Sequence, residues 1–193
     1  LKEFHAGDGT PRFNPFFILK MIVDIAAGVI SIRNKLYGPN YVTISACASS
    51  NTAIIAAFDT IRLNKAKIII AGGSEAAITP GSVGGFSSAQ ALSKRNDSPQ
   101  TASRPFDKDR DGFVMAEGAG ALVLEELEHA LKRGATIYGE MVGGGMAADA
   151  YHLTGTSPDG IGAALGMNRA LKEAGIKASE VDYINAHATS TPI

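Results

Sequence analysis

Residues 41–51 read YVTISACASSN, in which a run of β-forming residues meets the start of a helix at Cys47. The β-branched and aromatic residues of Tyr41–Ser45 predict a short strand after a turn at residues 38–40. Small and apolar residues over 47–64 predict a helix that packs closely against its neighbours. The junction therefore places the cysteine at the carboxyl end of a strand and at the amino end of a helix.

Helices and strands alternate outward from this junction in both directions. Helices are expected at residues 15–36, 125–133 and 159–174, the last two ending at Gly134 and Gly175. Strands are expected at residues 67–71, 119–124, 136–143 and 181–186, and a long polar loop at residues 86–111. This alternation predicts an α/β architecture with buried sheets, in which catalytic groups gather at the carboxyl ends of strands.

The composition is that of an ordinary globular domain. The chain has 193 residues, 18 of them basic and 19 acidic, so its net charge of −1 predicts no partner among nucleic acids or anionic membranes. No apolar run approaches the roughly 20 residues that span a bilayer. Because the chain starts at Leu1 and stops at Ile193 without a helix end, we expect a fragment that is incomplete at both ends.

Cys47 is the one cysteine of the chain, so no disulfide forms within it. A lone cysteine is most often a small buried apolar residue. At a helix start, however, free backbone N–H groups and the helix dipole stabilise a thiolate, which is the nucleophilic form. The N–H of Cys47 is also placed to face the oxyanion of an attacked carbonyl group. Both interpretations stay open here, because a nucleophile needs a partner.

His187 is the candidate partner, since it ends the last expected strand within NAHATST, residues 185–191. A histidine there can donate Nε2–H to an oxyanion or exchange protons near neutral pH, although a structural role is also open. His152 is more readily a structural residue. Cys47 and His187 are 140 positions apart (187 − 47 = 140), as in papain-like proteases, but the signature of that class is absent and the chain has no Trp.

Two further patterns imitate ligand sites. Residues 107–112, DKDRDG, open like a calcium-binding loop, but position 12 is Gly118 instead of Glu, so no metal is expected. Arg104, Arg110 and the three aspartates of this stretch predict an ion-pair network that holds the loop. The glycine pairs and triplets lack the spacing of a phosphate loop, so they predict close backbone packing around a narrow channel.

Five segments carry a family resemblance in the right order. They read SACASS (45–50), AGGSE (71–75), GGF leading to ALS (84–93), RPFD through RDGFV (104–114) and NAHATSTP (185–192). On these segments the chain resembles the β-ketoacyl-acyl carrier protein synthases of type II, the elongating condensing enzymes of fatty-acid synthesis. The resemblance extends over essentially all 193 residues.

The resemblance implies a thiolase-like fold of layered α-β-α-β-α arrangement, assembled as a homodimer and needing no cofactor. Residues 1–193 would be the central part of one such domain, covering most of its N-terminal half and the start of its C-terminal half. It also implies an enzyme of the cytoplasm in a bacterium, or of the plastid in a plant.

In that family, the cysteine matched by Cys47 takes an acyl chain from acyl carrier protein. Malonyl-acyl carrier protein then loses carbon dioxide, and its carbanion attacks the thioester to give a 3-ketoacyl product two carbons longer. His187 matches the first of two histidines that stabilise the enolate. Thr189 and Thr191 match residues that contact the pantetheine arm, and Phe86 matches a residue that lines the acyl pocket.

The sequence also departs from the family pattern. The second histidine, a lysine and a glycine-rich loop belong to segments beyond Ile193, so we expect these 193 residues alone not to catalyse elongation. Ser45 stands where many members have Thr, and Gln90 stands where an arginine that meets the carrier protein often sits. A ketosynthase of a polyketide or aryl-polyene pathway remains the alternative. A chain-length factor would lack the nucleophile, and a thiolase would need a second cysteine.

Overall fold

The computed structural model describes residues 13–192. It divides into two compact units, Leu1–Ser49 and Ser50–Ile193. The first unit contains the helices α2 (Phe17–Met21) and α3 (Ile25–Asn34). The helix predicted over residues 15–36 is therefore interrupted, because Ile22 leaves α2 in an extended conformation with ψ of 124°.

Residues 41–45 form no strand, so the prediction of a strand at Tyr41–Ser45 is wrong for this structure. A strand is stabilised by backbone hydrogen bonds to a neighbouring strand. None of the described residues of the first unit, 13–49, forms such a neighbour. The segment instead runs without regular structure into a 3₁₀ turn, η1 (Ala46–Ala48).

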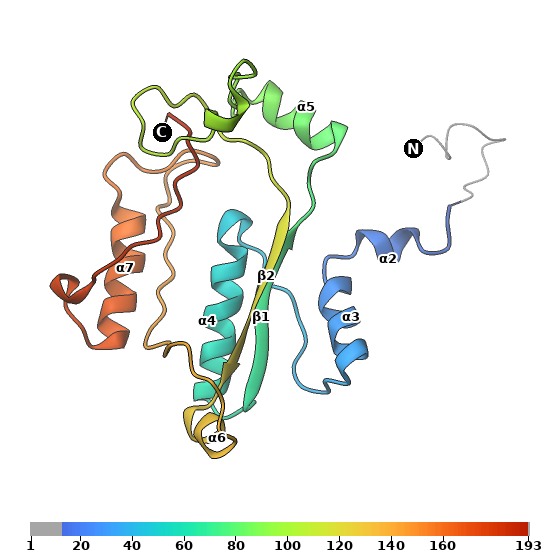
Figure 1. The fold of residues 1–193 in the computed structure, drawn as a ribbon, viewed down its shortest axis with the longest axis vertical. Coiled ribbons are helices and arrows are strands. Elements are labelled where there is room, and N and C mark those ends of the chain that lie inside the picture. The colour runs from blue at the N-terminus through green and yellow to red at the C-terminus, as the bar shows by residue number, and fades with distance from the viewer. Residues whose placement is uncertain (1–12, 193) are drawn as a thin grey trace. The chain divides into compact units, whose positions relative to one another are not determined.

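The second unit holds the helices and strands that follow the cysteine, apart from Ser49, the first residue of α4 (Figure 1). They are α4 (Ser49–Arg62), β1 (Ile68–Glu75), α5 (Pro80–Ser88), η2 (Pro99–Thr101), β2 (Gly118–Glu125), α6 (Leu127–Lys132), α7 (Ile161–Ala174) and η3 (Ala178–Glu180). The predictions of the helices at 47–64, 125–133 and 159–174 and of the strands at 67–71 and 119–124 are confirmed to within a few residues. Helix α5 was not predicted.

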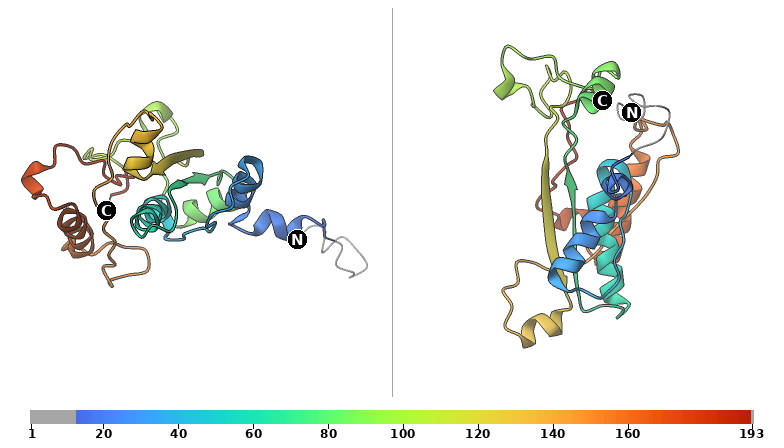
Figure 2. Two further views of the ribbon diagram at one scale, coloured as in Figure 1. Left: turned by 90° about the horizontal axis from the view of Figure 1, so that it is seen from below. Right: turned by 90° about the vertical axis from the view of Figure 1, so that its right-hand side faces the viewer.

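Strands β1 and β2 form a two-stranded antiparallel sheet whose register runs from Ile68 opposite Glu125 to Glu75 opposite Gly118. Helix α4 lies along this sheet, as two views of Figure 2 show. Glycine permits the close approach, because a Cβ atom added to Gly73 would lie 2.0 Å from the Oγ atom of Ser50 in α4. The sequence-based expectation of close backbone packing at the glycines is confirmed here.

The predicted strands at residues 136–143 and 181–186 are wrong, because both segments are irregular. Residues 143–145 instead pass between two helices. A Cβ atom added to Gly144 would lie 2.8 Å from the side chain of Ile55 in α4, and one added to Gly145 would lie 2.0 Å from the carbonyl oxygen of Gly166 in α7. Three glycines in a row therefore let this segment contact both helices.

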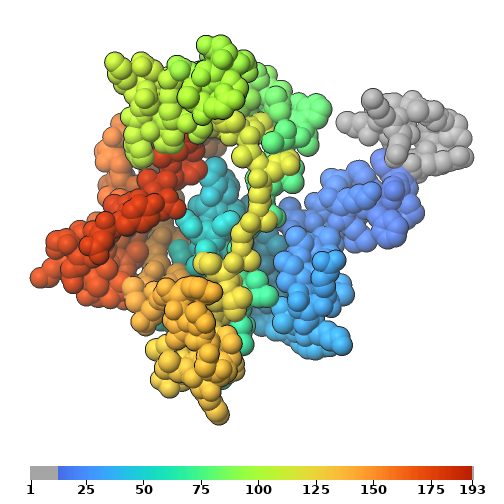
Figure 3. Space-filling view, in the orientation of Figure 1, coloured from blue at the N-terminus to red at the C-terminus, as the bar shows by residue number. Residues whose placement is uncertain are grey.

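The expectation of buried sheets is also wrong for this structure. Ile70 of β1 is 39% exposed and Val123 of β2 is 63% exposed, and Figure 3 shows β2 uncovered on the face drawn. Two strands with one helix beside them leave much of the sheet surface without cover. The buried apolar residues within the described part of the chain are all alanines: Ala57, Ala71, Ala102 and Ala130.

The chain exposes 15080 Å² in total. A folded monomer of 20.0 kDa exposes roughly 8,700 Å². The described helices and strands thus keep their order and register while large apolar side chains remain in contact with water. None of the described helices combines the length and the apolar character that a bilayer crossing requires.

Candidate active site

Cys47 is exposed and lies in the 3₁₀ turn that leads directly into α4. The preceding residue, Ala46, has a φ of 49°. This left-handed conformation costs a residue other than glycine roughly 1–2 kcal/mol. The strain is therefore stored next to the candidate nucleophile.

Ser49 holds this turn in place through its side chain and its backbone. Its Oγ atom accepts a hydrogen bond from the N–H of Ser45 at 2.9 Å and donates one to the carbonyl oxygen of Ala46 at 2.7 Å. The Thr43 hydroxyl donates to the carbonyl oxygen of Ser49 at 2.9 Å. These contacts hold residues on both sides of Ala46, so they offset part of the free-energy cost of its left-handed conformation.

His187 and the two threonines lie in the irregular segment 181–192 of the second unit. His187 is exposed, whereas Ser190 is only 2% exposed and has a φ of 68°. Hydroxyl oxygens of Thr189 and Thr191 are 2.9 Å apart and share a hydrogen bond. The left-handed conformation of Ser190 therefore bends the chain where two candidate pantetheine contacts lie.

The polar loop at residues 104–112 fixes this segment. The Ser190 Oγ atom accepts a hydrogen bond from the N–H of Arg104 at 3.0 Å, and the Ser190 carbonyl oxygen accepts one from the N–H of Gly112 at 2.9 Å. Arg110 donates from Nε to the carbonyl oxygen of Thr191 at 2.8 Å and from Nη2 to that of Pro192 at 3.1 Å.

The predicted ion-pair network of Arg104 and Arg110 with Asp107, Asp109 and Asp111 is therefore wrong, although the loop is indeed held. Residues 104–112 are described in full, and no ion pair joins these arginines and aspartates. The Asp111 carboxylate instead accepts hydrogen bonds from the Ser93 hydroxyl at 2.6 Å and the Lys94 N–H at 3.0 Å. These two contacts, the hydroxyl first, hold the pKa of Asp111 below its ordinary value.

Phe86, the candidate acyl-pocket residue, lies near the end of α5. That helix begins with Thr79 as N-cap, whose side chain accepts from the N–H of Ser82, and with Pro80 in its first turn. The ring of Phe86 contacts that of Phe113 edge to face, with 5.1 Å between centroids. Phe86 is 43% exposed, so this structure shows a partner for Phe86 but no closed pocket around it.

The candidate residues thus fall into two groups. Cys47 belongs to the first unit, while Phe86, His187, Thr189 and Thr191 belong to the second. The structure brings the two threonines together. The expected proximity of the Cys47 thiol to the His187 imidazole stays a prediction.

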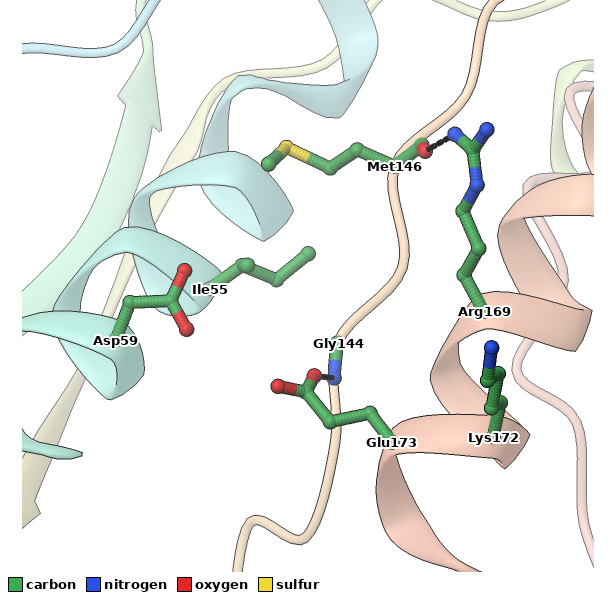
Figure 4. Close-up of a pocket in the computed structure, with 7 residues that line it drawn as sticks. All are labelled: Ile55, Asp59, Gly144, Met146, Arg169, Lys172 and Glu173. Carbon is green, nitrogen blue, oxygen red and sulfur yellow. Dashed lines mark hydrogen bonds between the residues drawn. The ribbon is translucent and has the colours of Figure 1, made fainter.

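A groove of about 430 Å³ in the second unit contains none of these residues. It lies between α4, residues 144–146 and α7 (Figure 4). The carboxylate of Glu173 accepts a hydrogen bond from the N–H of Gly144 at 2.7 Å, and Arg169 donates to the carbonyl oxygen of Met146. These bonds join α7 to the glycine segment, which is a structural role.

His152 also has a local structural role, as predicted. Its Nδ1 atom accepts hydrogen bonds from the N–H groups of Thr154 at 3.2 Å and Gly155 at 3.1 Å. Within residues 13–192, no group of three or more acidic, histidine or cysteine side chains is placed to hold a metal ion.

Sequence reasoning missed Ser49, Ser190 and the carbonyl contacts of Arg110. Ser49 could have been found, because serine side chains commonly bond to backbone groups three or four residues away. The contacts of Arg110 cross 81 and 82 positions of sequence, and no local pattern marks them.

Comparison with family models places two matches on the chain. Residues 3–130 match the model described as beta-ketoacyl synthase, N-terminal domain, and residues 138–193 match beta-ketoacyl synthase, C-terminal domain. Among curated proteins, the 3-oxoacyl-acyl-carrier-protein synthase 2 of Synechocystis is 57% identical over 184 residues, covering 95% of this chain and 44% of that protein.

A second curated relative is the chloroplastic 3-oxoacyl-acyl-carrier-protein synthase I of Arabidopsis thaliana. It is 53% identical over 183 residues, which cover 95% of this chain and 39% of that protein. The chain therefore spans less than half the length of these relatives.

Solved structures show the same likeness. One solved structure holds a type II polyketide synthase acyl-carrier protein in complex with its ketosynthase. It superposes on this chain with a TM-score of 0.90 at 36% identity. This match covers 99% of this chain and 48% of that one. A beta-ketoacyl synthase from Burkholderia phymatum gives 0.82 at 42% identity, covering 87% of this chain and 40% of that one. The prediction of an α/β, thiolase-like fold is thereby confirmed.

Proposed function

Because this chain belongs to the β-ketoacyl synthase family, we propose that the whole protein elongates fatty-acyl chains by decarboxylative condensation with malonyl-acyl carrier protein. Cys47 is the nucleophile. The high identity to proteins named 3-oxoacyl-acyl-carrier-protein synthase supports the fatty-acid reaction.

In the first half-reaction, the Cys47 thiolate attacks the carbonyl carbon of an acyl thioester on the carrier protein. A new carbon–sulfur bond forms to Cys47, and the bond to the pantetheine sulfur breaks. The carrier protein leaves with a free thiol after taking up a proton. The position of the cysteine at the start of α4 favours this step, since the helix dipole and free N–H groups stabilise negative charge at the attacking and attacked atoms.

In the second half-reaction, malonyl-acyl carrier protein binds and loses carbon dioxide, which leaves an enolate. His187 donates a hydrogen bond from its imidazole N–H to the enolate oxygen. The enolate carbon attacks the thioester on Cys47, a carbon–carbon bond forms, and the cysteine sulfur leaves. Thr189 and Thr191 bind the pantetheine arm, and Phe86 contacts the acyl chain.

The observation that carries the proposal is the conformation at Cys47. An exposed thiol stands in a turn with a left-handed alanine before it and a helix of 14 residues after it. A cysteine that only fills space in a core needs no strained neighbour. The strain at Ala46 has an explanation if the turn must present a nucleophile.

The partners and the setting belong to the same proposal. Acyl carrier protein, in acyl and malonyl forms, is the macromolecular substrate, and the whole protein is a homodimer. Residues 1–193 are the central part of one ketoacyl-synthase domain, which the ranges of the two family matches support. The enzyme acts in the cytoplasm of a bacterium, or in the plastid if the source is a plant.

Acylation of Cys47 tests the nucleophile directly. The whole protein is incubated with an acyl-acyl carrier protein, digested and analysed by mass spectrometry, with the Cys47→Ala variant as control. We expect the acyl mass on the peptide that contains Cys47, and cerulenin treatment to block it. Acylation at another residue, or equal labelling of the Cys47→Ala variant, would refute the proposal.

A ketosynthase of a polyketide pathway is the second candidate, because a structure of that class superposes with a TM-score of 0.90. The two candidates share the chemistry at Cys47 but differ in the fate of the 3-ketoacyl product. With the reductive partners of fatty-acid synthesis present, a fatty-acid enzyme yields saturated chains over several cycles. Unreduced poly-β-keto products formed under the same conditions would favour the polyketide enzyme.

A further inference from the structure

The guanidinium group of Arg110 holds two parts of the chain that are far apart in sequence. Its Nη1 atom donates to the carbonyl oxygen of Asp107 at 2.8 Å, within its own loop. Its Nε and Nη2 atoms donate to the carbonyl oxygens of Thr191 and Pro192. Arg110 therefore directs its charged group at backbone carbonyls, although three aspartates lie within three residues of it.

The loop that carries Arg110 is itself anchored on its other side. The backbone of Phe113 exchanges hydrogen bonds with Ala91 and Ser93, each at 3.0 Å. Asp111 accepts two more bonds from residues 93 and 94. Arg110 consequently extends from a fixed support and is not an arm that adapts freely to its partners.

The segment that Arg110 holds is the one with the paired threonine hydroxyls. Ser190 is bound on both its side chain and its carbonyl oxygen, and the next two carbonyl oxygens are bound by Arg110. Thr189 and Thr191 flank Ser190, and their hydroxyls meet at 2.9 Å. The positions of both hydroxyls thus depend on a backbone that the loop at 104–112 sets.

We propose that Arg110 is a positioning residue for the thioester arm of the substrate, holding the backbone on which Thr189 and Thr191 present their hydroxyls. This inference rests on the proposed function, because it takes the two threonines as the contacts of the pantetheine arm. Arg110 touches no substrate atom in this role. Lysine cannot replace it fully, since an ammonium group lacks the planar fork that reaches two adjacent carbonyl oxygens from two nitrogens.

The test uses the whole protein with Arg110→Lys and Arg110→Met variants and a matched Lys108→Met control, which removes one positive charge from the exposed side of the same loop. Two reactions are measured. The first is condensation of malonyl-pantetheine, the probe, with an acyl group already carried on Cys47, from which KM for the probe is obtained. The second is alkylation of Cys47 by iodoacetamide, a small reagent that has no pantetheine arm.

We expect KM for malonyl-pantetheine to rise about three- to tenfold in Arg110→Met, the effect of losing roughly one hydrogen bond to the arm. Arg110→Lys should show a smaller rise, because an ammonium group can still donate to one carbonyl oxygen. The rate of alkylation should stay within about twofold of the original protein, as should both readings for Lys108→Met.

Three results separate the ways in which the inference can fail. An unchanged KM in both Arg110 variants overturns the positioning role. A parallel fall in alkylation and condensation also overturns it, because Arg110 would then support the fold as a whole. If the original protein neither condenses malonyl-pantetheine nor acylates Cys47, the proposed function itself fails. Should Arg110→Met not fold, Arg110→Lys carries the test alone.

Discussion

Replacing Gly112 by alanine should strongly destabilise the protein. Gly112 has a φ of 145°, a region that L-residues with a side chain rarely enter. An added Cβ atom would lie 2.4 Å from the carbonyl carbon of Leu92 and 2.5 Å from the nitrogen of Ser93. Both neighbours are backbone atoms, so they cannot move aside by a simple rotation of a side chain.

The expected cost has two parts. Holding alanine in this backbone conformation costs about 1–3 kcal/mol. Relieving the overlap with residues 92 and 93 costs about 1–3 kcal/mol more, because the paired segments must separate. The sum, about 2–6 kcal/mol in the free energy of unfolding, is large for a change of one methyl group. The substitution also strains the hydrogen bond from the Gly112 N–H to the carbonyl oxygen of Ser190.

Urea denaturation of the whole protein, followed by circular dichroism, measures this cost. Gly118→Ala is the matched control, since no heavy atom lies within 4 Å of the Cβ that it adds and no positive φ restricts it. The control should lie within about 0.5 kcal/mol of the original protein. If Gly112→Ala unfolds at the same urea concentration as Gly118→Ala, the close approach between residues 91–93 and 112–113 is not present in solution, and the reasoning is refuted.

Three further predictions concern other parts of the chain. Hydrogen bonds from Arg133 and then His129 lower the pKa of Glu125 from 4.5 to about 2. The stabilisation by this carboxylate is therefore complete above pH 4.5 and is lost as the pH falls toward 2. The difference in urea midpoint between the original protein and Glu125→Gln should shrink from pH 7 to pH 3; a difference that stays constant with pH would contradict the ion pair. Ser49→Ala should slow alkylation of Cys47 by iodoacetamide about three- to tenfold, the effect of roughly one lost hydrogen bond, and Ser49→Thr should restore the rate. Equal rates in all three proteins would contradict a role of the Ser49 side chain in holding the turn. The 193 residues alone should bind a dye specific for exposed apolar surface and should form no detectable 3-ketoacyl product from acyl- and malonyl-acyl carrier protein; product formation would show that the condensation apparatus is complete within them.

Local signals in the sequence predicted α4, α6, α7 and the two paired strands well. Gly134 and Gly175 follow the ends of α6 and α7 with φ values of 69° and 70°, the left-handed conformation that glycine adopts without strain. The helix after Cys47 begins at Ser49, two residues later than predicted. These features depend on residues within a few positions of one another, so a local pattern contains the information that fixes them.

Contacts between distant segments were not predictable in this way. Thr189 and Thr191 would stand on the same side of an extended strand, about 7 Å apart. Their hydroxyls meet at 2.9 Å because Ser190 adopts a left-handed conformation, and that conformation is held by residues 104–112. The sequence around Ser190 has no glycine to mark the bend. The site is therefore shaped by a partner segment nearly 80 residues away.

The three predicted strands that did not form fail for a related reason. An apolar β-rich run such as Tyr41–Ser45 indicates that a segment can pair with another strand and be buried. It does not show which segment is its partner. β1 and β2 formed because each supplies the hydrogen-bonding partner of the other within the described residues. Residues 41–45, 136–143 and 181–186 have no such partner strand among residues 13–192.

The composition of these three segments still favours pairing. Val123 and Ile70 of the formed sheet also expose apolar area, and burying it would stabilise the protein by about 25 cal/mol per Å². We therefore expect these three segments to become strands in the whole protein, and hydrogen exchange should show their amides protected there but not in the 193 residues alone. Equal exchange in both would mean that the β-rich composition of these segments does not determine their conformation.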